Sequence, residues 1–159
     1  AVICLSDRCS RGEAEDLSTP AIVRICRDAG YPVVSRLVLP DGIEPLASAL
    51  RQLCDRRQAD LVLTSGGTGL SPRDLTPEAT ASICERDVPG IAEAMRSAGM
   101  EITPRAMLSR ARSVIRAQTL VVNLPGSPKA VEETLPVIMP VLDHAVMTMK
   151  GVVGTCVVF

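Results

Sequence analysis

Short apolar runs alternate along the chain with longer stretches in which apolar residues recur every three or four positions. The apolar runs, rich in Val, Leu and Ile, are residues 1–5, 33–39, 59–64 and 119–124. Runs of this length and composition are typical of buried strands. Helical spacing is found at residues 17–29 and 43–57, with Ser18 as the expected cap of the first. The alternation predicts an α/β domain with a largely parallel sheet.

The pattern is less regular after residue 64. Thr76-Pro77-Glu78 predicts the start of a helix that extends to Glu85, because proline is favoured in a first helical turn. The remaining predictions are a helix at 89–98, an amphipathic arginine-rich helical stretch at 103–118, a helix at 129–149 and a terminal strand at 152–159. We expect Pro136 and Pro140 to interrupt the helix at 129–149.

Composition narrows the class of protein. The 159 residues, 47% of them apolar, are enough for one core, so we predict a single domain over 1–159. A net charge of -1 provides no general attraction to nucleic acid or to a membrane. Tyr31 and Phe159 are the two aromatic residues, which argues against base stacking. No apolar run approaches the roughly 18 residues of a membrane span.

The cysteines indicate a reducing compartment. They are Cys4, Cys9, Cys26, Cys54, Cys84 and Cys156, with no C-x-x-C pair, and most lie within apolar runs. We therefore expect reduced thiols and a cytoplasmic location. The single histidine, His144, has no cysteine spacing beside it that would predict a zinc site.

Three predicted strands end in unusual loops: Leu5-Ser6-Asp7-Arg8, Thr64-Ser65-Gly66-Gly67-Thr68-Gly69 and Leu124-Pro125-Gly126-Ser127-Pro128-Lys129. Loops that follow parallel strands meet at one edge of the sheet, where ligands bind. Glycines allow backbone N–H groups to approach a phosphate, and Arg73, just beyond the second loop, can add a charged contact. The loops therefore predict one composite anion pocket, although each alone could be an ordinary strand-to-helix turn.

Familiar nucleotide motifs and a serine triad do not fit. Neither glycine cluster is followed by Gly-Lys, so there is no P-loop, and Pro72 breaks the dinucleotide spacing that could start at Gly67. There is no G-x-S-x-G sequence, which argues against an esterase. The remaining candidates are carboxylates beside glycines, namely Asp7, Asp41 and Asp74.

Two of these carboxylates predict a magnesium site. Asp41 follows a predicted strand and can approach the same sheet edge as Asp74, and Mg²⁺ is commonly held by one or two carboxylates together with substrate phosphates. Two simpler interpretations stay open. Asp41 could be a turn residue before Gly42, and Asp74 could cap the helix that starts at Thr76.

The motifs, taken in order, resemble the MogA/MoaB family of molybdenum cofactor biosynthesis, which includes the plant and gephyrin G domains. The segments that carry the resemblance are Thr64 to Gly69, Pro72-Arg73-Asp74, Thr76 to Ala79, Leu108-Ser109-Arg110 and Asn123 to Lys129. The resemblance extends from Ser6 to about Gly151. It implies a three-layer α/β/α sandwich with a mostly parallel central sheet, usually assembled as a homotrimer.

The resemblance also implies an activity and its residues. The activity is molybdopterin adenylyltransferase, which converts molybdopterin and ATP into adenylyl-molybdopterin and pyrophosphate with Mg²⁺, and a downstream metal-insertion enzyme is a possible partner. Asp41 and Asp74 align with the family's acidic pair, implied to be catalytic and metal-binding. The implied substrate-binding residues are Ser6, Asp7, Gly66, Gly67, Thr68, Gly69, Arg73, Ser109, Arg110, Pro125, Gly126, Ser127, Pro128 and Lys129.

One alternative remains within the family. A MoaB-like module would bind molybdopterin as a carrier or scaffold without adenylyl transfer. The Pro-Arg-Asp and Leu-Pro-Gly-x-Pro-Lys sequences favour the active branch. The arginines at 105, 110, 112 and 116 could lie near an anionic ligand or on a solvated helix face.

Overall fold

The computed structural model describes residues 1–152 and contains one six-stranded sheet. The strands are β1 (Val2–Leu5), β2 (Arg36–Leu39), β3 (Leu61–Ser65), β4 (Arg86–Asp87), β5 (Ser113–Arg116) and β6 (Thr119–Leu124). Their order is β2-β1-β3-β6-β5-β4. Strands β2, β1, β3 and β6 are mutually parallel, whereas β5 is antiparallel to both β6 and β4.

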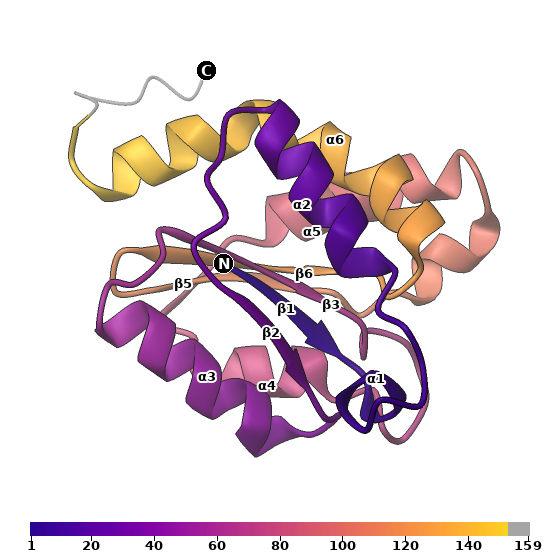
Figure 1. The fold of residues 1–159 in the computed structure, drawn as a ribbon. Helices are drawn as coiled ribbons and strands as arrows, with labels where there is room; N and C mark the ends of the chain where they lie inside the picture. Colours follow the sequence, from indigo (N-terminus) through magenta and orange to yellow (C-terminus); the bar gives the residue numbers. More distant parts are fainter. Residues whose placement is uncertain (153–159) are drawn as a thin grey trace.

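Helices cover both faces of this sheet (Figure 1). They are α1 (Asp7–Ser10), α2 (Ser18–Asp28), α3 (Ile43–Asp55), α4 (Thr76–Ser82), α5 (Pro89–Met100), the 3-10 helix η1 (Pro104–Leu108) and α6 (Pro128–Met149). Helices α2, α5 and α6 pack on one face, and α3 and α4 pack on the other. The predicted three-layer α/β/α sandwich with a mostly parallel sheet is therefore confirmed.

Alternation along the strands builds two separate cores. In β6, Leu120, Val122 and Leu124 face α2, α5 and α6, while Val121 faces α3 and α4, and all four are almost fully buried. Burial on both faces is the reason the central strands read as continuous apolar runs. The parallel strands β1, β3 and β6 end together, so their following loops lie at one edge of the sheet.

The observed elements correct several predicted boundaries. The strand predicted at 33–39 begins only at Arg36, and the helix predicted to Glu85 ends at Ser82. Ser18 does not cap α2. Asp16 accepts hydrogen bonds from the N–H groups of Ser18 and Thr19 at 3.1 and 2.9 Å instead. Aspartate satisfies free N–H groups at a helix start as well as serine does.

The prediction of a helical stretch at 103–118 is wrong. Residues Pro104–Leu108 form the 3-10 helix, and Ser113–Arg116 form β5, which pairs with β6 as a hairpin. Ala117 has φ +52° in the hairpin turn. The turn is held from outside, because the Ala117 N–H donates to the Glu85 carboxylate at 2.9 Å and Arg116 pairs with Asp55 at 2.8 Å.

The two prolines do not divide α6, which runs continuously from Pro128 to Met149. A proline removes one N–H donor, which leaves the carbonyl oxygens of Glu132 and Pro136 without their helical partner. Pro136, Pro140 and Glu132 are all exposed, so water can satisfy these oxygens. The predicted terminal strand at 152–159 lies, apart from Val152, outside the described residues.

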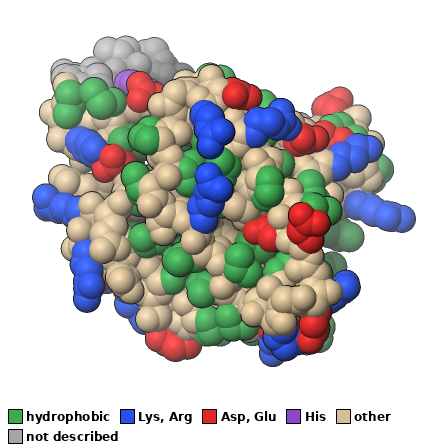
Figure 2. All heavy atoms as spheres, in the orientation of Figure 1, with side chains coloured by type: hydrophobic (Ala, Val, Ile, Leu, Met, Phe, Trp, Pro, Cys, Tyr) green, Lys and Arg blue, Asp and Glu red, His purple; other side chains and the backbone are tan. Residues whose placement is uncertain are grey.

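The visible surface has no single dominant charge. On the face in Figure 2, Lys and Arg side chains are interspersed with Asp and Glu, in keeping with the net charge of -1. Within residues 1–152, no helix has the length and apolar character needed to cross a bilayer.

The buried thiols lead to a prediction about labelling. The five cysteines in the described part of the chain are free; Cys4, Cys26 and Cys54 are buried. Burial raises the pKa of Cys4 to about 12 and that of Cys54 to about 11. Only the thiolate reacts, so at pH 8 we expect iodoacetamide to label Cys4 and Cys54 at least ~100-fold more slowly than the half-exposed Cys9.

Peptide mapping by mass spectrometry measures the three rates. In guanidinium the three cysteines should react alike, which provides the control. Rapid labelling of Cys54 in the native protein would contradict the burial of that thiol.

Candidate functional site

The loop after β3 adopts a backbone that requires glycine. Gly66 has φ +100° and Gly67 has φ +64°. A Cβ atom at Gly66 would lie 2.4 Å from the Leu5 carbonyl oxygen, and one at Gly67 would lie 2.4 Å from Thr76 Oγ1. The Thr76 hydroxyl in turn donates to the Gly66 carbonyl at 2.8 Å. The loop is therefore held between the end of β1 and the start of α4.

The loop after β6 lies directly against this glycine loop. A Cβ atom at Gly126 would be 3.1 Å from the Gly66 Cα, and the Ser65 hydroxyl donates to the Pro125 carbonyl at 2.9 Å. Ser127 caps α6, and Pro128 is its first residue. Thus the two predicted glycine motifs form one contiguous structure.

Two cavities flank the glycine loop. One, of about 260 Å³, includes Ser6, Gly66, Gly126 and Pro128 in its lining. The other, of about 460 Å³, is mostly apolar and lies between α5, η1 and α6. Its lining includes the predicted site residues Thr68, Gly69, Ser109 and Pro125. Residues from all three predicted loops therefore lie at this sheet edge, together with Ser109.

Four consecutive amides of the glycine loop are unpaired within the described chain. The backbone N–H groups of Gly67, Thr68, Gly69 and Leu70 donate to no other described residue. Amides left free in a glycine-rich loop are the groups that bind phosphate oxygens. This loop therefore has the donors that an anion site needs.

Asp7 and Asp41 form a reciprocal pair. The Asp7 N–H donates to Asp41 Oδ2 at 3.0 Å, and the Asp41 N–H donates to Asp7 Oδ1 at 3.1 Å. Arg73 joins them, because its Nη2 donates to Asp7 Oδ2 at 2.6 Å and to the Asp41 carbonyl at 3.2 Å. The hydrogen bond from Arg73 lowers the pKa of the Asp7 carboxyl below its usual value. Asp41 is therefore more than a turn residue, since it ties the first loop to the glycine region.

Asp74 follows Arg73 and does not cap α4. The N-cap position of α4 is Leu75, without a side-chain hydrogen bond. Asp74 Oδ2 instead accepts from the Ser71 N–H at 2.9 Å, and a Cβ atom at Gly69 would lie 2.9 Å from the same oxygen. The helix-capping interpretation is therefore wrong, and the half-buried carboxylate lies against the glycine loop.

The other predicted site residues occupy varied settings. Ser109 Oγ accepts from the Ala111 N–H at 3.3 Å. Lys129 is largely exposed and lies 3.8 Å from Glu133 on α6. Arg110 donates to the Gly69 carbonyl at 2.8 Å and pairs with Glu78, which lowers the pKa of the Glu78 carboxyl.

Two supporting residues were missed by the sequence analysis. Asp16 lines the smaller cavity. Burial favours its neutral form, but hydrogen bonds from Thr19 and Ser18 outweigh burial and lower its pKa. Asn123 is fully buried, and its amide donates to the hydroxyls of Thr64 and Thr80 at 3.0 and 2.9 Å. An aspartate two positions before Ser18 was a usable capping signal, whereas nothing local identifies the partners of Asn123.

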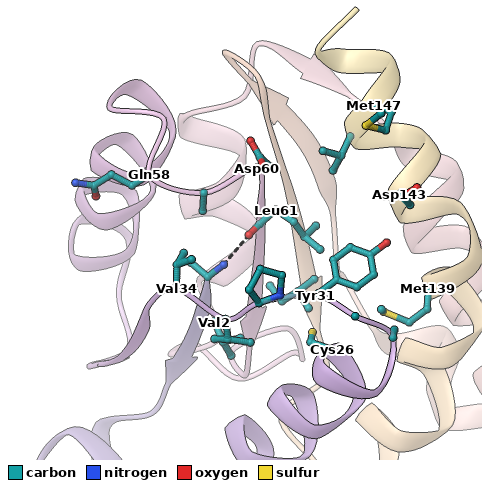
Figure 3. A pocket seen from close by; sticks show the side chains of 18 of the residues that line it. Val2, Cys26, Tyr31, Val34, Gln58, Asp60, Leu61, Met139, Asp143 and Met147 are labelled. Carbon is teal, nitrogen blue, oxygen red and sulfur yellow. Dashed lines mark hydrogen bonds between the residues drawn. The ribbon is translucent and has the colours of Figure 1, made fainter. Parts of the chain in front are cut away.

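A cavity larger than these two lies at the opposite end of the strands. It measures about 810 Å³, and Val2 and Leu61 line it near the starts of β1 and β3 (Figure 3). The Tyr31 ring and the Met139 and Met147 side chains also line it. None of the predicted site residues belongs to this cavity.

Comparison with known proteins points to one family. Residues 1–144 match the family model described as "Probable molybdopterin binding domain". The molybdopterin adenylyltransferase of Helicobacter pylori J99 is 38% identical, with 94% of this chain and 86% of that protein covered. Gephyrin of Dictyostelium discoideum is 41% identical over 91% of this chain and 21% of its own length.

A solved structure of a molybdopterin biosynthesis protein has the same fold. The crystal structure of the molybdopterin biosynthesis enzyme MoaB from Thermus thermophilus superposes with a TM-score of 0.89 at 43% identity, covering 94% of each chain. The extent of these matches and the glycine loop at the shared sheet edge lead to one conclusion: this chain belongs to the MogA/MoaB family of molybdenum cofactor biosynthesis.

Proposed function

We propose that this protein is a molybdopterin adenylyltransferase, which transfers AMP from ATP to molybdopterin and releases pyrophosphate. The observation that carries the proposal is the run of unpaired amides from Gly67 to Leu70, placed between two cavities. Free amides suit the polyphosphate of a nucleotide, and two adjoining cavities suit a reaction with two substrates. The name of the Helicobacter relative supports the same activity.

We propose that Asp41 and Asp74 would hold the Mg²⁺ through their carboxylates. Each uses Oδ2 to accept a backbone N–H, and within the described chain Oδ1 of each accepts no hydrogen bond. No group of three or more potential ligands occurs in residues 1–152, so phosphate oxygens and water would complete the coordination. The ion would supply neutralisation of the polyphosphate charge.

We infer that this protein acts mainly by positioning its two substrates, and less by transferring protons. In the reaction, an oxygen of molybdopterin bonds to the α-phosphorus of ATP while the bond from that phosphorus to the β-phosphate oxygen breaks. Pyrophosphate leaves with the electron pair of the broken bond. The glycine-loop amides would bind the phosphates, and Ser6, Ser109 and Pro125 to Pro128 would border the two substrates. Such transfer depends mainly on alignment and charge stabilisation.

We further propose a homotrimer in the cytoplasm that delivers its product to a metal-insertion enzyme. Supporting an assembly, Met100, Ile102 and Met107 near the end of α5 and in η1 are 43%, 51% and 60% exposed. Exposed apolar residues that lie close together often mark a protein interface. Analytical ultracentrifugation of the purified chain tests the trimer directly.

The activity is tested by incubating purified protein with molybdopterin, ATP and Mg²⁺ and measuring pyrophosphate. We expect stoichiometric pyrophosphate and adenylyl-molybdopterin. The second candidate function is a molybdopterin carrier, which the similarity to MoaB supports. Tight molybdopterin binding without a nucleotide-dependent product would identify this carrier function. Omitting molybdopterin provides the control for simple ATP hydrolysis.

A further inference from the structure

The guanidinium of Arg110 is bound entirely to parts of the protein that surround the glycine loop. Its Nε donates to the Gly69 carbonyl at 2.8 Å, and its Nη2 donates to the Asp74 carbonyl. Both Nη atoms also donate to the Glu78 carboxylate. The backbone N–H of Arg110 adds a bond to the Thr68 carbonyl at 2.9 Å. All three side-chain nitrogens are therefore engaged.

These contacts argue against a direct role of Arg110 in binding an anion. Arginine binds phosphates through the paired N–H groups of its planar fork. In this structure the fork is occupied by Glu78, whose side chain, like that of Arg110, is about two-thirds buried. A phosphate would have to displace a carboxylate that already neutralises the arginine.

The two carbonyls bound by Arg110 mark the ends of the turn 69–74. Within this turn, the Ser71 N–H donates to the Asp74 carboxylate at 2.9 Å. Arg73, on the same turn, reaches Asp7 in the first loop. Holding Gly69 and Asp74 therefore fixes both the last glycine of the loop and the backbone that carries the Asp74 carboxylate.

Arg110 is itself held from the opposite side. On α5, Arg96 Nη1 donates to the Ala111 carbonyl at 2.9 Å and to the Ser109 carbonyl at 3.4 Å. These carbonyls belong to the residues immediately before and after Arg110. Arg110 thus connects the turn 69–74 to the segment 109–111, which Arg96 holds in place.

We propose that Arg110, with Glu78 as its counterion, is a positioning residue that sets the conformation of the turn 69–74 and thereby the placement of the Asp74 carboxylate. Glu78 lies in the first turn of α4 and joins this helix to the same contact. The role in turnover rests on the proposed adenylyl transfer, whereas the role in ordering the turn does not.

The test uses Arg110→Lys, Glu78→Gln and the double variant, with Arg112→Lys as the matched control. Arg112 lies two residues further on, and its guanidinium pairs with Asp87 instead of with Glu78 or the turn backbone. Lysine keeps the charge but loses the planar fork, and glutamine keeps the shape of Glu78 but loses its charge. The readouts are kcat, KM, ATP affinity by calorimetry and hydrogen exchange of the amides at 66–76.

For both single variants we expect kcat to fall at least ~10-fold, ATP affinity to change less than ~3-fold, and exchange at 66–76 to accelerate. The double variant should be little worse than either single one, because both remove the same contact. The control should match the unmodified protein.

Loss of ATP affinity in Arg110→Lys with unchanged exchange at 66–76 would overturn the proposal and assign Arg110 to direct phosphate binding. Multiplying effects in the double variant would also contradict it. If the unmodified protein transfers no adenylyl group, the proposed function fails, but exchange at 66–76 still decides whether Arg110 and Glu78 order the turn.

Discussion

Asp74→Asn is expected to slow pyrophosphate release at least ~100-fold while the protein remains folded. The asparagine oxygen can still accept the Ser71 N–H bond that Asp74 Oδ2 makes at 2.9 Å. The backbone at this position also stays bound to Arg110. The substitution therefore removes a negative charge beside the glycine loop and keeps the local geometry, so a loss of rate would report the charge.

Initial rates at saturating ATP measure this effect, and thermal unfolding monitors the fold. Asp28→Asn provides the matched control, because Asp28 is exposed at the end of α2. The control should leave the rate within about twofold of the unmodified protein. An Asp74→Asn variant with normal turnover would show that this carboxylate is not needed for adenylyl transfer.

Gly66→Ala is expected to destabilise the protein by about 2–4 kcal/mol and to abolish measurable turnover. The expected loss of stability has a steric cause. Alanine disfavours φ +100°, and its Cβ would lie 2.4 Å from the Leu5 carbonyl oxygen. That oxygen belongs to a buried strand, which leaves little room for relaxation. To relieve this clash, the glycine loop would have to move away from β1. It would then also move away from Gly126, which packs against the Gly66 Cα atom.

Urea unfolding of the two proteins measures the change in free energy. Gly90→Ala is the matched control, since its added Cβ meets no atom within 4 Å apart from its chain neighbours and the backbone of its own helix. Gly90 lies in the first turn of α5, where alanine is favourable. An equally stable and equally active Gly66→Ala protein would show that the loop does not need its observed backbone.

Much of the fold follows from apolar patterning because the central strands are buried on both faces. The run 119–124 could be predicted to the residue, since every position of β6 is buried. At the sheet edge this signal disappears. In β2, burial alternates between exposed and half-buried positions, and the predicted strand was too long by three residues.

The hairpin of β5 and β6 was missed for a local reason. Its turn contains Ala117 at φ +52°, where Asn-Gly or Asp-Gly would be the usual signal. The conformation is imposed by tertiary contacts from Glu85 and Asp55. The amphipathic, arginine-rich sequence of this segment predicts a helix, although in the structure Arg112 and Arg116 make ion pairs beside the sheet.

The meeting of the loops could be predicted from the sequence, whereas the hydrogen-bond partners of their side chains could not. Parallel strand order brings Ser6, Gly66 and Gly126 into one cavity lining, as expected. The partners of Asp7, Asp41 and Arg110 depend on side-chain directions, which spacing does not encode. For Arg110 in particular, the sequence allows a solvated helix face or a ligand contact, whereas the structure shows an ion pair with Glu78.

The β5–β6 hairpin has a consequence for how this protein can change over evolutionary time. Arg110 precedes one arm and Pro125 follows the other, so the pairing of Ser113 with Val122 fixes how the two flanking segments meet at the site. The turn at 117–118 lies at the far end of the hairpin. A longer turn would leave the β5–β6 pairing register unchanged. One residue inserted in either strand would shift that register and turn the side chains of the strand to the opposite face of the sheet. Natural length variation should therefore concentrate at the turn.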